Sequence, residues 1–393
     1  MTVLFVTPYM RKKGQKPVGG GLEAYLLRVA GALKTLGHSV IILSLGTEDT
    51  HYYENGIEIF FVRYSPVNCL AGSLNLLCTR LTQSLTLNRK IAGLLRERAI
   101  DIIQFPQTYG AAICYFEKTP AVLRLSSYAK QYFVDSYGKK ELYVEAFMER
   151  ASAKRCNAVF APSNVVANAF SQDIHRGVTV IESPFWNDVL ALSDNIYRDQ
   201  LSGKKYVLFI GRLCIEKGVM EIREIIYDFF VKNTDYYFVC CGDDGRINGL
   251  SAIQSLRLAS GEFKEQVIYL QTMPHDELYP VIQHADFVIC PSRMENLSNA
   301  CMEAMYFKRV VIGTNGTSYE QLIKDGISGL LCEPRNARDL LEKMNKAASL
   351  DEKRKSEIGE NARKRIVRLA PEYTVKKLLR FYQYIIDNVY RQS

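Results

Sequence analysis

The chain has 393 residues, of which 48% are hydrophobic and 23% are charged, and its formal net charge is +8. This length is greater than one ordinary hydrophobic core organises, so we expect two domains of roughly 200 residues each. The composition excludes a disordered or fibrous protein. The basic residues are scattered rather than gathered into one stripe, which argues against a nucleic-acid partner.

Cysteine usage and the apolar segments indicate a cellular location. The ten cysteines include no CxxC pair, so we expect a reduced, cytoplasmic protein without a zinc site or a disulfide framework. The chain enters a strand at Val3–Val6 without the basic head and apolar core of a signal peptide. No apolar run reaches the ~20 residues that a membrane span requires. Peripheral contact with the cytoplasmic face of the membrane remains an open alternative.

Short β-branched runs alternate with helical patterns along the first half of the chain. Strands are predicted at residues 3–6, 40–43, 57–62, 102–103, 122–125 and 159–160, and helices over residues 22–36 and up to about residue 98. In the first helix apolar residues recur at helical spacing, and Gly37 follows as a stop signal. This alternation is typical of a parallel sheet sandwiched between helices.

The same rhythm restarts after residues 186–203, a polar and irregular segment that we expect to be a hinge. Further strands are predicted at residues 206–210, 236–240, 267–270, 287–290, 310–312 and 329–331. The expected organisation is an α/β protein with Rossmann-like domains at residues 1–185 and 204–371 that face each other across a cleft, with residues 372–393 packing back on the first. Open α/β sheets bind ligands at the carboxyl ends of their strands.

The first strand end carries a basic loop. Residues 11–16 contain four cations, and Gly20 and Gly21 follow just before a helix. Glycines let backbone amides approach an anion closely, and the start of a helix favours negative charge. A purely conformational role for these glycines in the turn is an equally good interpretation.

A second strand end carries two more cations. Gly211 follows the strand at residues 206–210, and Arg212 and Lys217 come directly after it. Such a pair can neutralise a diphosphate without a metal, because arginine offers a planar fork and lysine a point charge. Surface cations are common, so this pattern alone is weak.

The third strand end is the stretch PSRMENLSNACMEAMY at residues 291–306, in which seven residues separate Glu295 from Glu303. If a helix begins between residues 296 and 298, its first amides are unpaired and can hold phosphate or hydroxyl oxygens. Glu303 then shares a helical face with Asn299, while Glu295 stays on the loop. One carboxylate reaches a group near the phosphates and the other a diol one turn deeper, which is the layout of a nucleotide sugar.

Taken together, these motifs resemble those of the retaining glycosyltransferases of family GT4, glycosyl transferases group 1, which have the GT-B fold. The matching segments of the first half are Gly-Gly-x-Glu at residues 20–23, Gly-His-x-Val at residues 37–40 and Ser-Pro at residues 183–184. Those of the second half are residues 211–212, 217–218, 242–245, 291–292, 295–305, 325–326 and 329. The resemblance spans nearly the whole chain, and it is more specific in the second half.

The resemblance implies a metal-independent, retaining hexosyltransferase that uses a nucleotide diphosphate sugar and no cofactor. Its acceptor would be a glycan or a lipid-linked saccharide bound by the first domain, as in cell-surface polysaccharide assembly. The implied catalytic residues are Arg212 and Lys217, which stabilise the leaving diphosphate, and Glu295, which faces the sugar. The implied donor-binding residues are Gly20, Gly21, Gly211, Thr272, Met273, Asn296, Leu297, Ser298, Asn299 and Glu303, the last of which would bind the ribose hydroxyls.

The acceptor side departs from the family pattern. Members often carry a histidine where this chain has Ser126, and the acceptor-side candidates here are Arg124, Ser126, Ser127 and Tyr128. In the mechanism that the resemblance implies, the leaving phosphate can take the acceptor's proton, so the change is tolerable. All five histidines, including His275, are expected to be structural or solvent-facing. The Asp243-Asp244 pair is expected to form a turn rather than a metal site.

Several alternatives remain open from the sequence. Residues 68–98 are predicted to form a core helix, and the alternative is a basic, apolar face that lies on the membrane. The aromatic segment at residues 128–143 is a further acceptor-side candidate. A non-catalytic partner that binds nucleotide sugars and a GT-B epimerase are the rival functions. A dinucleotide-dependent oxidoreductase is disfavoured, because neither glycine cluster supplies G-x-G-x-x-G between a strand and a helix.

Overall fold

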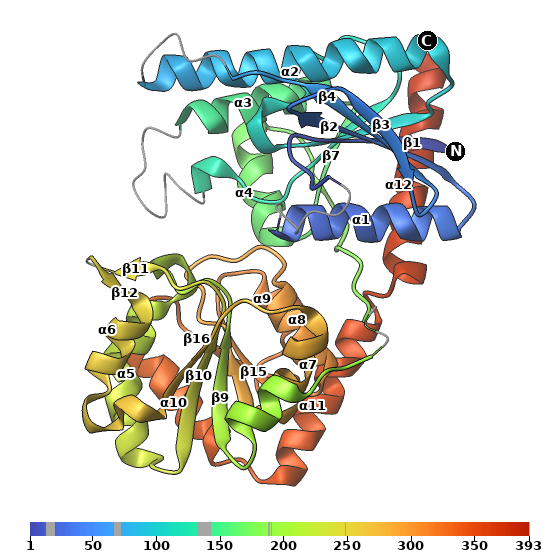
Figure 1. The fold of residues 1–393 in the computed structure, drawn as a ribbon. Coiled ribbons are helices and arrows are strands. Elements are labelled where there is room, and N and C mark those ends of the chain that lie inside the picture. The colour runs from blue at the N-terminus through green and yellow to red at the C-terminus, as the bar shows by residue number, and fades with distance from the viewer. Residues whose placement is uncertain are drawn as a thin grey trace. The chain divides into compact units, whose positions relative to one another are not determined.

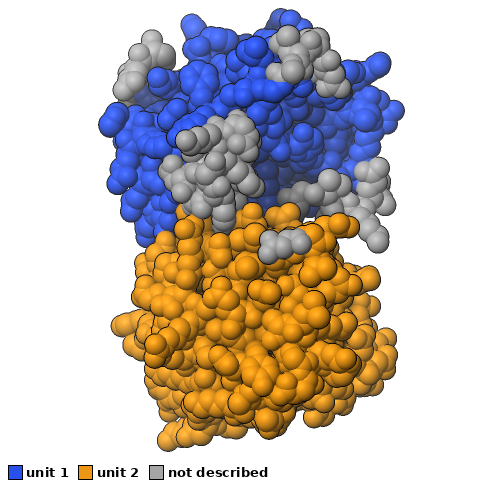
Figure 2. Space-filling model, turned by 90° about the vertical axis from the view of Figure 1, so that its left-hand side faces the viewer, with its two compact units in different colours: residues 1–184, 370–393 blue, residues 185–369 orange. Residues whose placement is uncertain are grey.

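The computed structural model describes residues 1–12, 20–66, 72–131, 143–187, 189, 191–247 and 249–392. The chain divides into two compact units, here called unit 1 (residues 1–184 and 370–393) and unit 2 (residues 185–369), which are coloured separately in Figure 2. Each unit has a mostly parallel sheet with helices packed against it (Figure 1). Part of the predicted basic loop, residues 13–19, and most of the aromatic segment, residues 132–142, lie outside the described residues.

The described part of unit 1 contains an eight-stranded sheet in the order β3-β4-β2-β1-β5-β6-β7-β8. The strands are β1 (Thr2–Thr7), β2 (Ser39–Gly46), β3 (Thr50–Glu54), β4 (Ile57–Arg63), β5 (Ile102–Pro106), β6 (Ala121–Arg124), β7 (Ala158–Ala161) and β8 (Thr179–Val180). Neighbouring strands are parallel except β3 and β4, which form an antiparallel pair at the edge. The order reverses between β1 and β5, so their carboxyl ends flank the crevice where open α/β sheets bind ligands.

Helices cover both faces of this sheet because side chains of the buried strands alternate between two cores. Leu4 and Val6 of β1 belong to one core, and Val3 and Phe5 belong to the other. The helices of unit 1 are α1 (Gly20–Thr35), α2 (Gly72–Glu97), α3 (Tyr143–Arg155), α4 (Asn164–Ile174) and α12 (Pro371–Gln392), with the short turn η1 (Thr108–Gly110). The C-terminal helix α12 therefore packs on unit 1, where the Tyr382 hydroxyl donates to Gln104 Oε1 at 2.5 Å.

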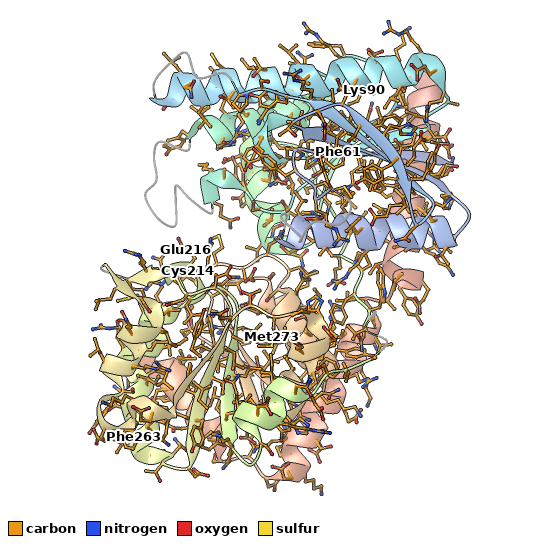
Figure 3. The ribbon with its side chains drawn as sticks, in the orientation of Figure 1. Phe61, Lys90, Cys214, Glu216, Phe263 and Met273 are labelled. Atoms are coloured by element: carbon orange, nitrogen blue, oxygen red, sulfur yellow. The ribbon has the colours of Figure 1, made fainter. Side chains whose placement is uncertain are left out.

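Helix α2 contains most of residues 68–98, for which the sequence left open either a core helix or a face that lies on the membrane. Its second half buries Leu87, Ile91 and Leu94 in the core of unit 1. Lys90 lies with its Nζ 5.1 Å from the centroid of the Phe60 ring on β4, and Figure 3 labels this lysine. The core-helix interpretation therefore holds for the face that carries these three residues, whereas Leu74 and Leu85 are exposed. Among the described residues, no helix is both long and apolar enough to cross a membrane.

Unit 2 contains a six-stranded, wholly parallel sheet in its described residues, in the order β13-β10-β9-β14-β15-β16. The strands are β9 (Lys205–Ile210), β10 (Tyr236–Cys241), β13 (Val267–Leu270), β14 (Phe287–Ile289), β15 (Val310–Thr314) and β16 (Leu330–Cys332). Numbered along the chain, this is the order 3-2-1-4-5-6 of a Rossmann sheet. The order reverses between β9 and β14, which makes their carboxyl ends the switch point of unit 2.

The helices of unit 2 complete its two cores. They are α5 (Val219–Lys232), α6 (Ala252–Ala259), α7 (His275–His284), α8 (Asn299–Tyr306), α9 (Tyr319–Leu322), α10 (Ala337–Ala348) and α11 (Glu352–Val367). A small hairpin of β11 (Arg246–Ile247) and β12 (Leu250–Ser251) lies outside the main sheet. Val207 and Phe209 of β9 face one core, and Tyr206 and Leu208 face the other. The predicted α/β fold class with Rossmann-like domains is confirmed.

Candidate functional site

The segments that follow β9 and β14 touch at the switch point of unit 2. Gly218 has φ +82°, and a Cβ at this position would lie 2.1 Å from the Pro291 carbonyl oxygen. The backbone N–H of Arg293 also donates to the Glu216 carbonyl at 3.0 Å. Only glycine allows this approach, and the approach brings the motif after β9 against the motif after β14.

A second close backbone contact joins the ends of β9 and β10. Gly242 has φ +144°, and a Cβ there would lie 2.2 Å from the Gly211 carbonyl oxygen. The Gly211 N–H donates to the Cys241 carbonyl at 2.9 Å. Gly211, one of the predicted donor-binding residues, therefore also has a structural role. It holds two strand ends together at the edge of the sheet where ligands bind.

Lys217 and Glu295 form an ion pair between these two segments, from Lys217 Nζ to Glu295 Oε2. The same carboxylate oxygen lies within hydrogen-bond distance of two hydroxyls, Ser292 Oγ at 3.3 Å and Tyr319 OH at 3.4 Å. The Asn296 N–H donates to the other oxygen, Oε1, at 3.3 Å. Glu295 is thus fixed at the tip of β14. The sequence analysis gave Ser292 no role, although it lies in a matching motif, and it missed Tyr319, since a hydroxyl carries no distinctive spacing.

The loop between Glu295 and α8 is also tied to α9. Ser318 Oγ donates to the Asn296 carbonyl, and the Ser318 N–H donates to the Glu295 carbonyl at 3.3 Å. Helix α8 begins at Asn299, and its N-cap is Ser298, whose Oγ accepts from the Cys301 N–H at 3.3 Å. The helix therefore starts later than the range used in the sequence analysis, because Ser298 is extended and its side chain satisfies a first-turn amide.

Glu303 lies one turn into α8 and is 3% exposed. His275 Nε2, at the start of α7, lies 3.4 Å from Glu303 Oε1. The His275 side chain is 47% exposed, as expected for a solvent-facing histidine, but it also contacts a residue of the site motifs. The sequence does not reveal this contact, because it does not show that α7 begins beside α8. Burial, followed by the negative charge of Glu303, raises the pKa of Cys241 to about 12. Cys241 ends β10, so the Glu303 carboxylate lies close to the strand ends at the switch point.

Cys290, which follows β14, is close to both carboxylates. Burial first, then the charge of Glu295 and more weakly that of Glu303, raise the pKa of this thiol to about 12, against a lowering effect of Lys217. The three charged side chains of the motifs therefore surround one strand end. Their separate segments converge in space, as the resemblance implies for a donor site.

The remaining predicted donor residues lie on neighbouring loops of unit 2. Arg212 is exposed on the loop after β9, which also carries Cys214 and Glu216, labelled in Figure 3. The hydroxyl of Thr272 donates to Asp243 Oδ1 at 2.7 Å. Met273, also labelled there, packs against the core shared by α7 and α8. Leu297 packs against the same core.

The two aspartates after β10 stabilise local structure. Asp244 accepts from Ser251 Oγ at 2.6 Å and from the Ile253 N–H at 3.1 Å, and Asp243 accepts from Thr272. In the described residues, no three His, Cys, Asp or Glu side chains group in a way that could hold a metal ion. These contacts are those of a capped turn that leads into α6.

The acceptor-side candidates lie in unit 1, at the end of β6. Arg124 is 5% exposed, its guanidinium lies 3.4 Å from the Tyr25 ring centroid, and its Nη2 donates to Ser183 Oγ at 3.1 Å. Burial lowers the pKa of this guanidinium. Arg124 is thus an internal residue of unit 1 rather than a surface group.

Gln107, at the end of β5, organises the next two candidates and was missed by the sequence analysis. Its Oε1 accepts from Ser126 N at 2.8 Å and from Ser126 Oγ at 3.0 Å, and its Nε2 donates to Ser127 Oγ at 3.2 Å. Tyr128 is buried, and its hydroxyl donates to Asp173 on α4. The Ser126–Tyr128 segment is therefore held from both sides.

The two glycines of the first predicted motif, Gly20 and Gly21, are the first residues of α1. The buried Glu23 of the same turn accepts from the Arg11 N–H at 3.3 Å, and the Arg11 guanidinium lies 3.5 Å from it. This contact ties the segment after β1 to the start of α1.

Comparisons with known proteins concern the family of the chain and its fold. A family model described as glycosyl transferases group 1 matches residues 196–365, and one described as Glycosyltransferase Family 4 matches residues 19–184. An alpha-D-kanosaminyltransferase of Streptomyces kanamyceticus is 25% identical over 162 residues, which are 41% of this chain and 41% of that protein. The chain spans about half the length of the curated relatives it matches.

Solved structures show the same fold over nearly the whole chain. Sucrose-phosphate synthase from Thermosynechococcus elongatus has a TM-score of 0.77 at 17% identity and covers 98% of this chain and 99% of its own. HepE of Anabaena, in complex with UDP and glucose, has a TM-score of 0.73 at 18% identity and covers 98% of this chain and 100% of its own. At this level of identity the likeness concerns the fold alone.

Proposed function

Because this chain belongs to the group 1, family 4 glycosyltransferases and has the GT-B fold, we propose that it transfers a hexose-type sugar from a nucleotide diphosphate sugar to a saccharide. The acceptor is a glycan or a lipid-linked saccharide of the kind used in cell-surface polysaccharide assembly. Unit 2 binds the donor and unit 1 binds the acceptor. The reaction retains the anomeric configuration of the donor and needs no metal.

The observation that carries this proposal is the convergence of Lys217, Glu295 and Glu303 at the switch point of unit 2. They come from segments after β9 and β14 and from α8, and all three lie close to the end of β14. A diphosphate requires a cation, a ribose diol requires an acceptor of hydrogen bonds, and a polarised sugar is stabilised by a nearby carboxylate. The three side chains provide these groups in one place.

The leaving diphosphate is stabilised by fixed positive charge. The Lys217 side chain is 30% exposed, and its ammonium group can replace Glu295 by a phosphate oxygen as its ionic partner. Arg212 is exposed on the same loop. Preorganised cations at the position where negative charge develops are usually the largest contribution to such a reaction. This arrangement supports a transfer that requires no metal ion.

Retention is supported by the composition of the acceptor-side segment. An inverting enzyme needs a general base to deprotonate the acceptor. Ser126 and Ser127 are bound to Gln107, and the nearby Glu149 is 4% exposed with a pKa that burial raises to about 8. Burial therefore favours the protonated form of Glu149 at neutral pH, and this form does not accept a proton. In the retaining reaction the leaving phosphate accepts the proton instead.

A saccharide acceptor is supported by an aromatic pair at the switch point of unit 1. Tyr9 follows β1 and is 48% exposed, and its ring centroid lies 5.6 Å from that of Tyr109, which follows β5. Tyr109 has φ +62°, an uncommon conformation for a bulky residue, and its ring stacks on the Arg80 guanidinium at 3.4 Å. Such rings offer apolar surface to the faces of sugars.

A lipid-linked acceptor would also require peripheral contact with a membrane, for which the exposed Leu74 of α2 is a candidate.

The proposal is tested in two steps. Thermal-shift measurements are made with UDP, ADP, GDP and the corresponding nucleotide sugars. One nucleotide series should raise the melting temperature of the protein, since ligands that bind the native state stabilise that state. The preferred nucleotide sugar is then incubated with a saccharide panel, and NMR of the product should show the α-linkage from an α-linked donor. A β-linked product would contradict retention. Hydrolysis without transfer to any saccharide would favour the non-catalytic partner protein.

A further inference from the structure

Glu303 is a carboxylate buried to 3% exposure in α8. A buried carboxylate loses its hydration, so its hydrogen-bond and ionic partners determine where its oxygens point. Its carboxylate lies beside His275, with Nε2 of the imidazole 3.4 Å from Glu303 Oε1. This histidine lies at the opening of α7, next to the loop that carries Thr272 and Met273.

The ring of His275 is itself held in place. It stacks on Tyr279, one helical turn later, with ring centroids 5.3 Å apart and an interplanar angle of 15°. Tyr279 is fully buried and packs against Phe307, which follows α8, at 4.9 Å between centroids. The imidazole therefore rests on a rigid contact between the two helices and presents Nε2 to the Glu303 carboxylate.

The histidine contacts Oε1 of Glu303, and the second oxygen, Oε2, lies outside this contact. A ribose diol has two hydroxyls on adjacent carbons, and a carboxylate accepts from both only if its plane is correctly oriented. We propose that His275 is a positioning residue that holds one oxygen of Glu303 and thereby orients the carboxylate toward the ribose hydroxyls of the nucleotide donor. The inference rests on the proposed function, and it assigns to His275 the discrimination between ribonucleotides and deoxyribonucleotides.

A merely structural histidine would predict a different result. If His275 only packed α7 against α8, its loss would affect all ligands of unit 2 alike. A positioning role affects most strongly the ligands that present both ribose hydroxyls to Glu303. The decisive quantity is therefore the ratio of affinities for a ribonucleoside diphosphate and its 2′-deoxy counterpart.

The experiment is isothermal titration of the full chain with UDP, ADP and GDP, followed by the 2′-deoxy form of the tightest of them. His275→Phe keeps a ring on Tyr279 but removes the N–H, and His275→Gln restores a donor. We expect His275→Phe to weaken the ribonucleotide about tenfold and the deoxynucleotide, which keeps one of the two hydroxyls, clearly less, so that the ratio of the two affinities falls. His275→Gln should recover most of the ratio.

His284→Phe is the matched control, because this histidine is on the same helix and stacks on Tyr197 at 3.9 Å. It should leave both affinities unchanged. If His275→Phe does not fold, His275→Ala is judged by the same ratio. An unchanged ratio in the His275 variants, whether both affinities fall together or neither falls, would overturn the positioning role.

The proposed function is judged separately in the same titrations. If Glu303→Ala weakens the ribonucleotide but the His275 variants keep the wild-type ratio, the inference fails and the nucleotide site stands. If wild-type protein binds no nucleoside diphosphate at all, both the inference and the proposed function are overturned.

Discussion

Lys217 and Glu295 lie 78 residues apart in the chain, and their side chains form an ion pair at the carboxyl edge of the unit 2 sheet. The family resemblance implies that they act on different parts of the donor, the diphosphate for Lys217 and the sugar for Glu295. Their contact means that the two charges neutralise each other when no ligand is bound. Under the proposed function, we expect the donor diphosphate to replace Glu295 as the ionic partner of Lys217.

Glu295→Gln is expected to depress turnover strongly without weakening nucleoside diphosphate binding. The amide keeps the shape of the side chain but removes the negative charge, so Lys217 becomes more available to the phosphates while the sugar loses its carboxylate. The measurement combines steady-state kinetics with titration of the nucleoside diphosphate.

Arg212→Ala and Lys217→Ala are the comparison variants for Glu295→Gln. Both should lower affinity and turnover together, because the diphosphate is charged before and during the reaction. Full activity in Glu295→Gln would remove this residue from the active site.

Glu303→Ala is expected to weaken the nucleoside diphosphate by on the order of tenfold or more, because a hydrogen bond to a charged group contributes roughly 1.5 to 3 kcal/mol. Calorimetric titration measures this directly. Glu265→Ala, which removes an exposed carboxylate of unit 2, is the control and should have no effect. Equal affinities of Glu303→Ala and wild type would show that the ribose assignment is wrong.

Turnover is expected to be the same in excess EDTA as with added magnesium or manganese. The reason is the pair of cations, Arg212 and Lys217, on the loop that follows β9, which can serve where another enzyme would use a metal. Assays of one protein sample under the three conditions test this. Loss of activity in EDTA with recovery in manganese would point instead to Asp243 and Asp244.

Gly218→Ala is expected to destabilise unit 2 more than Gly203→Ala. Both glycines have a left-handed φ, +82° and +75°, but only at Gly218 would a Cβ meet a backbone atom, the Pro291 oxygen at 2.1 Å. The conformational cost alone is about 1 kcal/mol, so Gly203→Ala measures it and the excess at Gly218 reports the steric contact. Thermal unfolding of both variants provides the comparison, and equal losses would contradict it.

Glu149→Gln is expected to gain stability relative to wild type as the pH rises from 5 to 8. Burial raises the pKa of Glu149 to about 8, against an opposing hydrogen bond from the Ala129 N–H. Between the usual glutamate pKa and this value the folded protein keeps a proton that the unfolded chain releases, so the free energy of unfolding of wild type falls with rising pH. One pKa unit corresponds to about 1.4 kcal/mol, and the amide has no such dependence.

Denaturant unfolding of wild type and Glu149→Gln at pH 5, 6, 7 and 8 measures this difference. The variant at the exposed Glu117, Glu117→Gln, controls for the general effect of removing a carboxylate. A difference between Glu149→Gln and wild type that stays constant over this range would show that Glu149 is not buried in its neutral form.

The sequence by itself determined the fold class and the segments that form the candidate donor site. Apolar runs such as Val207–Ile210 and helical spacing such as that of residues 22–36 are local patterns, and their alternation leads to parallel sheets covered by helices. The glycines and charged residues after the strands were predictable for the same reason. In a parallel sheet every residue that directly follows a strand lies at one edge, whatever the strand order.

The contacts within the site were decided only by the tertiary structure. Lys217 meets Glu295 because β9 and β14 are neighbours in the sheet, and His275 meets Glu303 because α7 begins beside α8. Gln107 likewise reaches Ser126 because β5 and β6 are paired. Strand order and helix packing depend on how the whole core is buried, and no local spacing records them. The sequence therefore identified candidate residues, and the packing of distant segments decided which of them lie in contact.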